Sequence, residues 1–268
     1  MNIETIKLIV CDVDGTILPA GKNSLSLRTV EAFHKAKQNG YTILICTGRH
    51  YTLIPESFFK DLDMDVIGTI NGACLVKRDG TVIEKHPMSK ETMEAITDMC
   101  KETGTGLGFK FEDAIVTYAN YDLFIREYAH NDHERSLIIN DDATCSHHEK
   151  YGYPLGTFII GEYEKLLPYV SSMPDLVFAW SVRKGFDVFL KDINKTTAIE
   201  RVLKDHGWTW DNVIAFGDAG NDTCMIEKAK IGVAMKNARD DVQKYADILA
   251  DSCENDGVAK MLEQLHIA

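Results

Sequence analysis

The sequence contains no apolar run that approaches the roughly 18 residues that a membrane-spanning helix needs. The first apolar stretch, Leu8–Cys11, is short and ends in an Asp-x-Asp motif, so the N-terminal segment does not have the form of a signal peptide. We therefore expect a cytoplasmic protein with no membrane partner.

The sequence also lacks a C-x-x-C pair and has no excess of positive charge. Its seven cysteines are scattered, and several lie in apolar runs, which is typical of reduced core thiols in a reducing compartment. The formal net charge of −12 argues against a nucleic-acid partner or an anionic membrane surface. Small molecules and cations are the expected partners.

No internal repeat or low-complexity tract is present, and 45% apolar with 26% charged residues is typical of a globular protein. A length of 268 residues suffices for one large domain or two linked ones. Both ends of the chain alternate strand-like and helix-like segments, which indicates a parallel sheet with right-handed crossovers. The expected strands are 7–11, 41–46, 66–70, 213–216, 231–235 and 248–250, and the clearest helices are 28–39, 195–206 and the stretch around 258–265.

Residues 83–186 have a different pattern, with a denser mix of helices, hairpin-like strands and aromatic residues. Ser89 can cap a helix, and residues 109–119 and 157–160 have the pattern of strands. Because unstructured loops of this length are rare in compact proteins, we expect an inserted α/β domain here.

Two aspartates, Asp12 and Asp14, come directly after the first apolar strand. Strand periodicity of two points both carboxylates to one side, where the pair is costly unless a cation neutralises it or one member carries a proton. Gly15 and Thr16 then turn the chain, which leaves the pair at the sheet edge where open α/β sheets bind ligands. An Asp-rich turn with local side-chain bonds explains this motif equally well on its own.

A second acidic segment, Phe216-Gly-Asp-Ala-Gly-Asn-Asp222, also follows an apolar strand. Asp218 and Asp222 lie on a glycine-rich turn into a helix, and Asn221 is placed to cap that helix and to contact an oxyanion. Oxygen ligands clustered on loops favour Mg²⁺ over zinc or copper. A loop that only caps a helix would account for one of these residues and not for the others.

Two weaker signals lie at equivalent places in the predicted sheet. Thr47 and Gly48 follow the second strand in Cys46-Thr-Gly-Arg49, where a hydroxyl and exposed N–H groups can hold phosphate oxygens, although such a segment is usually a plain turn. Lys195 begins the helix 195–206, where a lysine is more often a solvated surface residue. These signals become informative together, because all these residues fall at strand ends or at a helix start, where a doubly wound sheet binds its ligands.

Together these segments resemble the haloacid dehalogenase (HAD) superfamily, and specifically its Cof-type phosphatases. The matching pieces are Asp12-Val-Asp-Gly-Thr16, Thr47-Gly-Arg49, Asn71-Gly-Ala73, Lys195, Gly217-Asp-Ala-Gly-Asn-Asp222 and Val233-Ala-Met-Lys-Asn-Ala238. The resemblance covers essentially the whole chain. It implies an α/β fold with a Rossmann-like parallel-sheet core, residues 1–82 and 187–268, and an inserted α/β cap, residues 83–186, that determines substrate specificity.

The resemblance also implies a role for each acidic residue. Asp12 is expected to be the nucleophile and a Mg²⁺ ligand, and Asp218 to complete the metal ligands of the protein. Asp14 is expected to bind Mg²⁺ through its backbone carbonyl and to act as general acid and then base. For this Asp14 has to carry a proton, and the neighbouring charge of Asp12 favours its protonated form.

The transferring phosphoryl group is expected to be held by the residues that supply hydrogen-bond donors and positive charge. These are the Val13 backbone, Thr47, Gly48, Lys195 and Asn221, and Asp222 is expected to support them from behind. Mg²⁺ and Lys195 would offset the repulsion between an attacking carboxylate and the anionic phosphate oxygens.

We therefore predict a Mg²⁺-dependent phosphatase, a monomer or small homo-oligomer, that hydrolyses a small phosphate monoester such as a sugar phosphate through an aspartyl phosphate. One alternative is a phosphotransferase or phosphomutase on sugar phosphates, which shares the aspartyl-phosphate step. Another is a non-catalytic sensor of phosphorylated metabolites, which needs no acid or base. The histidines in 130–133 and 145–149 suggest zinc, but their spacing lacks a second matched half, so we expect polar cap loops or helix faces there.

Overall fold

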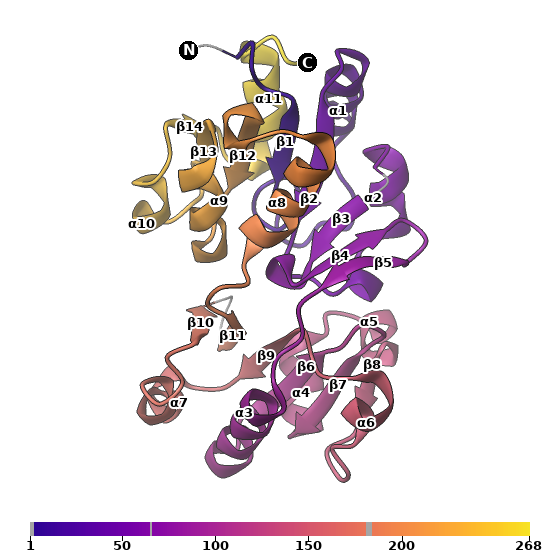
Figure 1. Cartoon of the computed structure of the whole chain (residues 1–268), viewed down its shortest axis with the longest axis vertical. Coiled ribbons are helices and arrows are strands. Elements are labelled where there is room, and N and C mark those ends of the chain that lie inside the picture. The colour runs from indigo at the N-terminus through magenta and orange to yellow at the C-terminus, as the bar shows by residue number, and fades with distance from the viewer. Residues whose placement is uncertain (1–2, 65, 181–183) are drawn as a thin grey trace.

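The computed structural model describes residues 3–64, 66–180 and 184–268, which form two β-sheets, each with its own helices (Figure 1). The larger sheet takes its strands from both ends of the chain, and the smaller sheet takes its strands from the middle. The predicted α/β fold class, with a Rossmann-like core and a second α/β unit, is confirmed. Within the described residues, no helix is long and apolar enough to cross a membrane.

The larger sheet has eight strands in the order β14-β13-β12-β1-β2-β3-β4-β5. The strands from β14 to β3 are parallel, as predicted, and β4 and β5 add an antiparallel hairpin at one edge. Strand β1 pairs with β12 in register from Leu8 opposite Val213, so the two ends of the chain meet inside this sheet. The strands are β1 Leu8–Cys11, β2 Thr42–Cys46, β3 Val66–Thr69, β4 Cys74–Lys77, β5 Val82–Lys85, β12 Val213–Gly217, β13 Ile231–Met235 and β14 Ile248–Ala250.

Helices cover both faces of this sheet, which explains why every residue of β1 is buried. Phe33 of α1 and Leu262 of α11 pack in the apolar core on one face. Ile199 of α8 and Met225 of α9 pack in the core on the other. The helices of this unit are α1 Leu27–Gln38, α2 Glu56–Asp61, α8 Lys195–His206, α9 Thr223–Lys228, α10 Asp240–Gln243 and α11 Gly257–Gln264.

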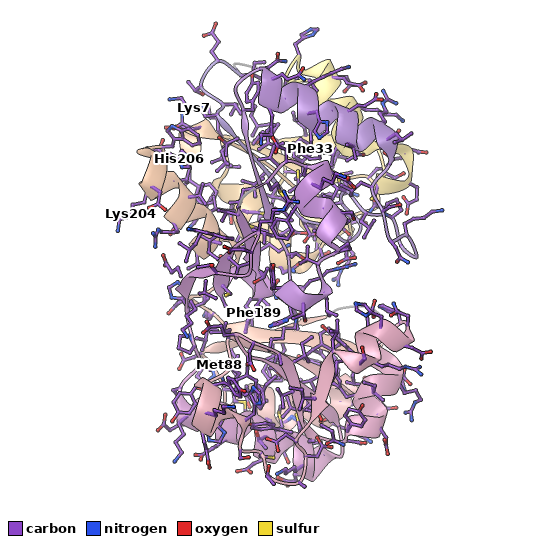
Figure 2. The ribbon with its side chains drawn as sticks, turned by 90° about the vertical axis from the view of Figure 1, so that its right-hand side faces the viewer. Lys7, Phe33, Met88, Phe189, Lys204 and His206 are labelled. Carbon is purple, nitrogen blue, oxygen red and sulfur yellow. The ribbon has the colours of Figure 1, made fainter. Side chains whose placement is uncertain are left out.

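The smaller sheet has six strands in the order β10-β11-β9-β6-β7-β8. All its pairings are antiparallel except that of β7 with β8. Its apolar core, which includes Met88, is separate from the core around Phe33 (Figure 2). Its elements are α3 Lys90–Thr103, β6 Gly106–Lys110, β7 Ile115–Ala119, α4 Tyr121–Tyr128, α5 Asp132–Ser136, β8 Ile138–Asn140, α6 His147–Tyr151, β9 Gly156–Ile160, α7 Tyr163–Val170, β10 Leu176–Trp180 and β11 Gly185–Leu190.

Helix ends follow the signals in the sequence. Ser89 caps α3 by accepting a hydrogen bond from the Thr92 N–H at 3.1 Å, as predicted. Gly104 and Gly207 end α3 and α8 in the left-handed conformation, each at a φ of +66°. The predicted strand 109–119 is instead a hairpin of β6 and β7, because the chain turns between them.

The expected junctions at 82/83 and 186/187 fall inside strands. Strand β5, which spans 82–85, pairs with β4 of the larger sheet, and β11, which spans 185–190, pairs with β9 of the smaller sheet. The chain therefore passes between the two sheets after β5 and after β11. The hairpin β4-β5 carries no long apolar run, so the sequence pattern gave no sign that it extends the larger sheet.

His50 connects the loop after β2 to the smaller sheet. Its Nε2 lies 2.8 Å from the Phe111 carbonyl oxygen, and the Thr52 N–H donates to its Nδ1 at 3.2 Å. Burial lowers the pKa of His50 from 6.5 to about 4, so the ring is neutral near neutral pH and Nε2 carries the hydrogen. The neutral ring thus donates to the Phe111 carbonyl through Nε2 and accepts from the Thr52 N–H at Nδ1.

We predict that His50 makes stability depend on pH. As the pH falls from 6.5 toward about 4, His50 gains a proton in the unfolded chain but not in the folded protein, so stability is lost in this window. Urea unfolding should show the stability advantage of wild type over His50→Gln shrinking by about 3 kcal/mol from about pH 7 to about pH 4. The exposed His34→Gln should show no such trend, and an advantage independent of pH would contradict a neutral His50.

Candidate active site

Asp12 lies at the carboxyl end of the parallel sheet, directly after β1. Its N–H donates to the Phe216 carbonyl of β12 at 3.0 Å, and the residue is only 5% exposed. Gly15 then turns the chain at a φ of +81°, and a Cβ at this position would collide with the carboxylate of Asp218. Glycine at position 15 therefore lets the turn approach Asp218 closely.

Lys195 is the first residue of α8, and its position is set by the residue before it. The Asn194 side chain caps α8 by accepting from the Thr196 N–H at 3.0 Å. The Asn194 carbonyl lies against Gly72, where a Cβ would collide with it. This close contact fixes the start of α8 against the turn that follows β3.

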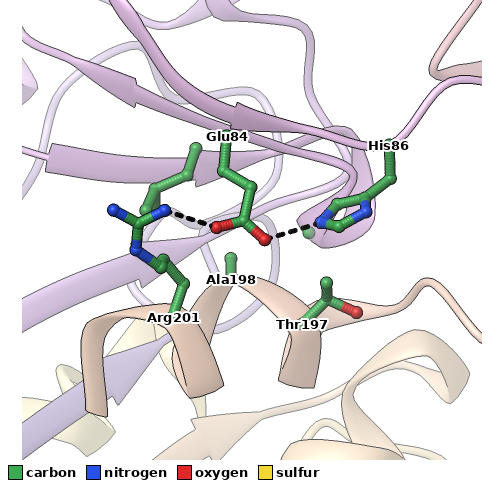
Figure 3. Close-up of a pocket in the computed structure, with 7 residues that line it drawn as sticks. Glu84, His86, Thr197, Ala198 and Arg201 are labelled. Carbon is green, nitrogen blue, oxygen red and sulfur yellow. Dashed lines mark hydrogen bonds and ion pairs between the residues drawn. The ribbon is translucent and has the colours of Figure 1, made fainter. Parts of the chain in front are cut away.

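Further along α8, a chain of polar side-chain contacts ties the helix to the end of β5 (Figure 3). Arg201 donates to Glu84 at 2.7 Å, and Glu84 also lies 2.9 Å from Nε2 of His86. His86 lies just after β5, at the point where the chain leaves the larger sheet. The chain leaving this sheet and the helix that carries Lys195 are therefore held together.

The Lys195 ammonium group lies between two carboxylates and has no solvent exposure. It donates to Oδ1 of Asp12 and, at 2.6 Å, to Oδ1 of Asp222. Burial alone would lower the pKa of Lys195, but attraction to Asp12 and Asp222 outweighs this effect and the pKa is raised. Lys195 is therefore a permanent cation in the site.

One ammonium does not balance the acidic groups around it. Burial raises the pKa of Asp12 although Lys195 opposes the shift, and burial together with the charge of Asp222 raises the pKa of Asp218 to about 7. Carboxylate oxygens of Asp12, Asp218 and Asp222 lie within 4.8 Å of one another. They are the one such group of possible metal ligands found in the described ranges of the chain. An excess of buried negative charge held by hard oxygen donors suits Mg²⁺.

Asp222 has little capacity left for a metal. Its Oδ2 accepts from the N–H groups of Asp218 and Ala219, both at 2.9 Å, and its Oδ1 accepts from Lys195. Asp12 and Asp218 are the carboxylates that remain available to a cation. The contacts of Asp222 hold the backbone of Asp218 and Ala219 and the ammonium of Lys195 in place.

The loop after β2 is held tightly beside these charges. The Thr47 N–H donates to the Gly68 carbonyl and the Asn71 N–H donates to the Thr47 carbonyl, both at 2.9 Å. The Asn221 side chain donates to Oδ1 of Asn71 at 2.8 Å, which joins the turn after β3 to the segment after β12. Ile70 and Asn71 have φ values of +52° and +53°, and a β-branched residue adopts such a value only when its surroundings impose it.

Val13 lies in the turn next to Asp12. Its side chain is fully buried, and its carbonyl accepts from the N–H groups of Ile17 and Leu18 at 3.0 and 2.9 Å. The Val13 carbonyl is therefore already hydrogen-bonded within the turn. The Val13 N–H is the backbone group that can serve a phosphoryl oxygen.

The two aspartates of the first motif do not share one environment, in contrast to the expectation that strand periodicity holds them together. Strand β1 ends at Cys11, so a period of two does not extend to Asp14. The Asp14 side chain is 57% exposed and forms a bidentate pair with Arg49, with Nε–Oδ2 and Nη2–Oδ1 distances of 2.8 and 2.6 Å. Both carboxylate oxygens of Asp14 therefore accept a charge-assisted hydrogen bond from one guanidinium group.

Asn71 and Arg49 are polar residues of the site to which the sequence patterns assigned no role. Both belong to segments that matched the HAD motifs, but their contacts depend on loops that come together only in the folded chain. Asparagine at position 71 was the one local hint in the sequence, because asparagine tolerates the positive φ that this residue has.

The histidine segments lie mostly on short helices of the smaller unit. His133 lies in α5, and His147 and His148 lie in α6, as expected for polar helix faces. The His147 ring stacks on Tyr151 at a centroid distance of 4.3 Å and pairs with Asp113 at 3.0 Å. These contacts account for His147 without a zinc ion.

Comparison with known families agrees with this geometry. The model of a family described as haloacid dehalogenase-like hydrolase matches residues 9–262, which is nearly the whole chain. The chain belongs to the haloacid dehalogenase-like hydrolases. The match includes every residue of the site described above, from Asp12 to Asp222.

Two curated relatives span almost the same length as this HAD-like chain. The pyridoxal phosphate phosphatase YbhA of Escherichia coli (strain K12) is 27% identical over 268 residues, covering 96% of this chain and 98% of the relative. The 5-amino-6-(5-phospho-D-ribitylamino)uracil phosphatase YcsE of Bacillus subtilis (strain 168) is 27% identical over 257 residues, covering 96% and 94%. Among solved structures, the HAD subclass IIB sugar phosphatase BT4131 has a TM-score of 0.84 and 25% identity, covering 98% of this chain and 100% of that one.

These findings identify a Cof-type HAD enzyme, a phosphoric monoester hydrolase.

We predict that Lys195 is essential to the stability of this site when no metal is added. Lys195→Met leaves Asp12 and Asp222 buried without their cation, which should lower the free energy of unfolding by about 3–5 kcal/mol in EDTA. Lys204→Met, at an exposed position on the same helix (Figure 2), should change it by less than about 0.5 kcal/mol. Equal stability of the two variants in urea unfolding would mean that Asp12 and Asp222 are not both ionised.

Proposed function

We propose that this HAD hydrolase is a Mg²⁺-dependent phosphatase that acts on a small phosphate monoester through an aspartyl phosphate at Asp12. The observation that carries the proposal is the pair of Asp12 with a fully buried Lys195, beside a second carboxylate, Asp218, that remains available to a cation. Bound Mg²⁺ would neutralise the carboxylates and the phosphoryl oxygens.

Asp12 is proposed as the nucleophile because one of its oxygens is free to react. Lys195 occupies Oδ1, while Oδ2 has no hydrogen-bond partner in the described part of the chain. Attack of Oδ2 on phosphorus forms the aspartyl phosphate and breaks the bond to the leaving oxygen. Attack by water on the same phosphorus then breaks the Asp12–phosphoryl bond and releases phosphate, so one difficult step becomes two easier ones.

Asp14 is proposed to give a proton to the leaving oxygen and later to take one from the attacking water. Its Mg²⁺ contact through the backbone carbonyl is part of the same proposal. The Arg49 pair has to open before Asp14 can reach a leaving oxygen, because both of its carboxylate oxygens accept from the guanidinium. A substrate that places its leaving group between Arg49 and Asp14 would open this pair.

The phosphoryl oxygens are proposed to be held by the N–H of Val13, the Thr47 hydroxyl, the N–H of Gly48, the Asn221 amide and Lys195, with Asp222 supporting the loop. Support comes from contacts that leave donors available. The Arg49 N–H donates to the Thr47 oxygen at 3.2 Å, so the Thr47 hydroxyl hydrogen can point elsewhere. Donors fixed before the substrate arrives are those that stabilise developing charge.

The smaller unit is proposed as the cap that selects the substrate, with its junctions after β5 and after β11. The relatives are named for pyridoxal phosphate, a ribitylaminouracil phosphate and sugar phosphates, which are all small phosphate monoesters. A substrate of this class is proposed here as well. A cytoplasmic location is proposed from the scattered free cysteines, and the protein is proposed to be a monomer or a small homo-oligomer.

The test is phosphate release from a panel of metabolite phosphates, in Mg²⁺ and in EDTA. Wild type should release phosphate only with Mg²⁺, and Asp12→Asn and Asp14→Asn should each lower kcat by more than about a thousandfold while the circular dichroism spectrum is kept. Asp98→Asn, an exposed position on α3, is the matched control and should retain full activity. Turnover by Asp12→Asn at the wild-type rate would rule out the aspartyl-phosphate route.

A further inference from the structure

A lysine from the smaller unit reaches the loop proposed to hold the phosphoryl group. Lys110 is the last residue of β6, and its side chain is only 3% exposed. Its ammonium donates to the Gly48 carbonyl and to Oδ1 of Asp187 on β11, both at 2.7 Å. It also lies 5.7 Å from the centre of the Phe158 ring on β9.

Strand register explains why these side chains meet. Lys110 is opposite Gly156 of β9, and Phe158, two residues on from Gly156, is opposite Asp187 of β11. All four positions therefore share one face of the smaller sheet. A Cβ at Gly156 would collide with Ile70 of the larger unit, so this face lies against the turn after β3. The Lys110–Asp187 pair is thus built at the junction of the two units.

The Lys110–Asp187 pair contacts the candidate site at the Gly48 carbonyl. Within the loop, the backbone of Thr47 bonds to Gly68 and Asn71, and the Arg49 carbonyl accepts from the Ile70 N–H at 3.0 Å, all inside the larger unit. The Gly48 carbonyl is different, because its partner comes from the smaller unit. The Gly48 N–H has no protein acceptor within the described residues, so it is available to a phosphoryl oxygen.

The peptide between Gly48 and Arg49 is held at both ends. Lys110 holds its carbonyl, and the Thr47 hydroxyl oxygen accepts from its N–H at 3.2 Å. A rotation of this peptide would move the Thr47 hydroxyl and the Arg49 side chain, which pairs with Asp14. The Lys110 ammonium therefore fixes a peptide that adjoins the Gly48 N–H, the Thr47 hydroxyl and the Arg49 side chain.

We propose that Lys110 is a positioning residue through which the cap sets the phosphate-binding loop, so that the loop has its binding geometry only while β6 lies against it. Asp187 orients the ammonium and neutralises its charge in the buried junction. The inference rests on the proposed function, since it assigns the loop to the phosphoryl group. It predicts that a substitution in the cap weakens binding of the phosphoryl group itself, and not only of the rest of the substrate.

The test compares Lys110→Met with Lys165→Met, an exposed lysine on α7 of the same unit. Calorimetry measures the Kd of inorganic phosphate in the presence of Mg²⁺, and p-nitrophenyl phosphate gives kcat/KM. Lys110→Met should weaken phosphate binding at least about tenfold and lower kcat/KM by about tenfold to a hundredfold, because a small displacement of a positioned group has effects of this size. Lys165→Met should match wild type in both.

Lys110→Met leaves Asp187 without its cation, so a loss of activity could arise from poor folding. The double variant Lys110→Met, Asp187→Leu removes both charges, and its melting temperature shows whether the fold is kept. A folded double variant should still bind phosphate weakly. If its phosphate Kd and kcat/KM lie within about twofold of wild type, the pair only joins the two units and the inference is wrong.

The wild-type measurement separates this inference from the proposed function. If wild type releases no phosphate from any ester, the proposed function fails. If wild type is active and the Lys110 variants are equally active, only the positioning role of Lys110 fails.

Discussion

A single ammonium group, that of Lys195, holds together parts of the chain that lie far apart in the sequence. Asp12 comes from the end of β1, Asp222 from the segment after β12, and Lys195 from the start of α8. Removing these charges from water is costly unless they pair with good geometry, and both carboxylates accept from the same nitrogen. The pairing of β1 with β12, the cap of α8 and the close turn at Gly72 all serve to bring these charges together.

The same arrangement leaves the site with more negative than positive charge. Asp218 lies beside Asp12 and Asp222, and burial first and then the charge of Asp222 raise its pKa to about 7. Three carboxylates against one ammonium leave two negative charges if all are ionised, which the divalent cation proposed above would offset.

Much of the fold could be predicted because the strands and helices of the larger unit have clear local sequence patterns. Buried parallel strands are continuous apolar runs, and the elements at 195–206, 231–235 and 248–250 have the predicted bounds. The convergence of Asp12, Lys195, Asp218 and Asp222 followed from their places at strand ends and at a helix start.

What could not be predicted depends on contacts between distant segments. The pair of Arg49 with Asp14 arises because the turns after β1 and β2 adjoin, and no local pattern records this. The role of Lys110 could not be predicted for a similar reason. Its partners are fixed by strand register within the smaller sheet and by the packing of that sheet against the larger unit. Strands β4, β5, β8, β10 and β11 are short or lack a clean alternation, so the sequence pattern did not mark them as strands.

The central claim is that Asp12, paired with Lys195, attacks phosphorus and carries the phosphoryl group for part of each turnover. The most direct measurement is a rapid acid quench of wild type during turnover of p-nitrophenyl phosphate with Mg²⁺, followed by mass mapping of the peptides. The account predicts a phosphoryl group on the Asp12 side chain. Phosphate release with an unmodified Asp12 peptide throughout, or with the phosphoryl group on a different residue, would contradict it.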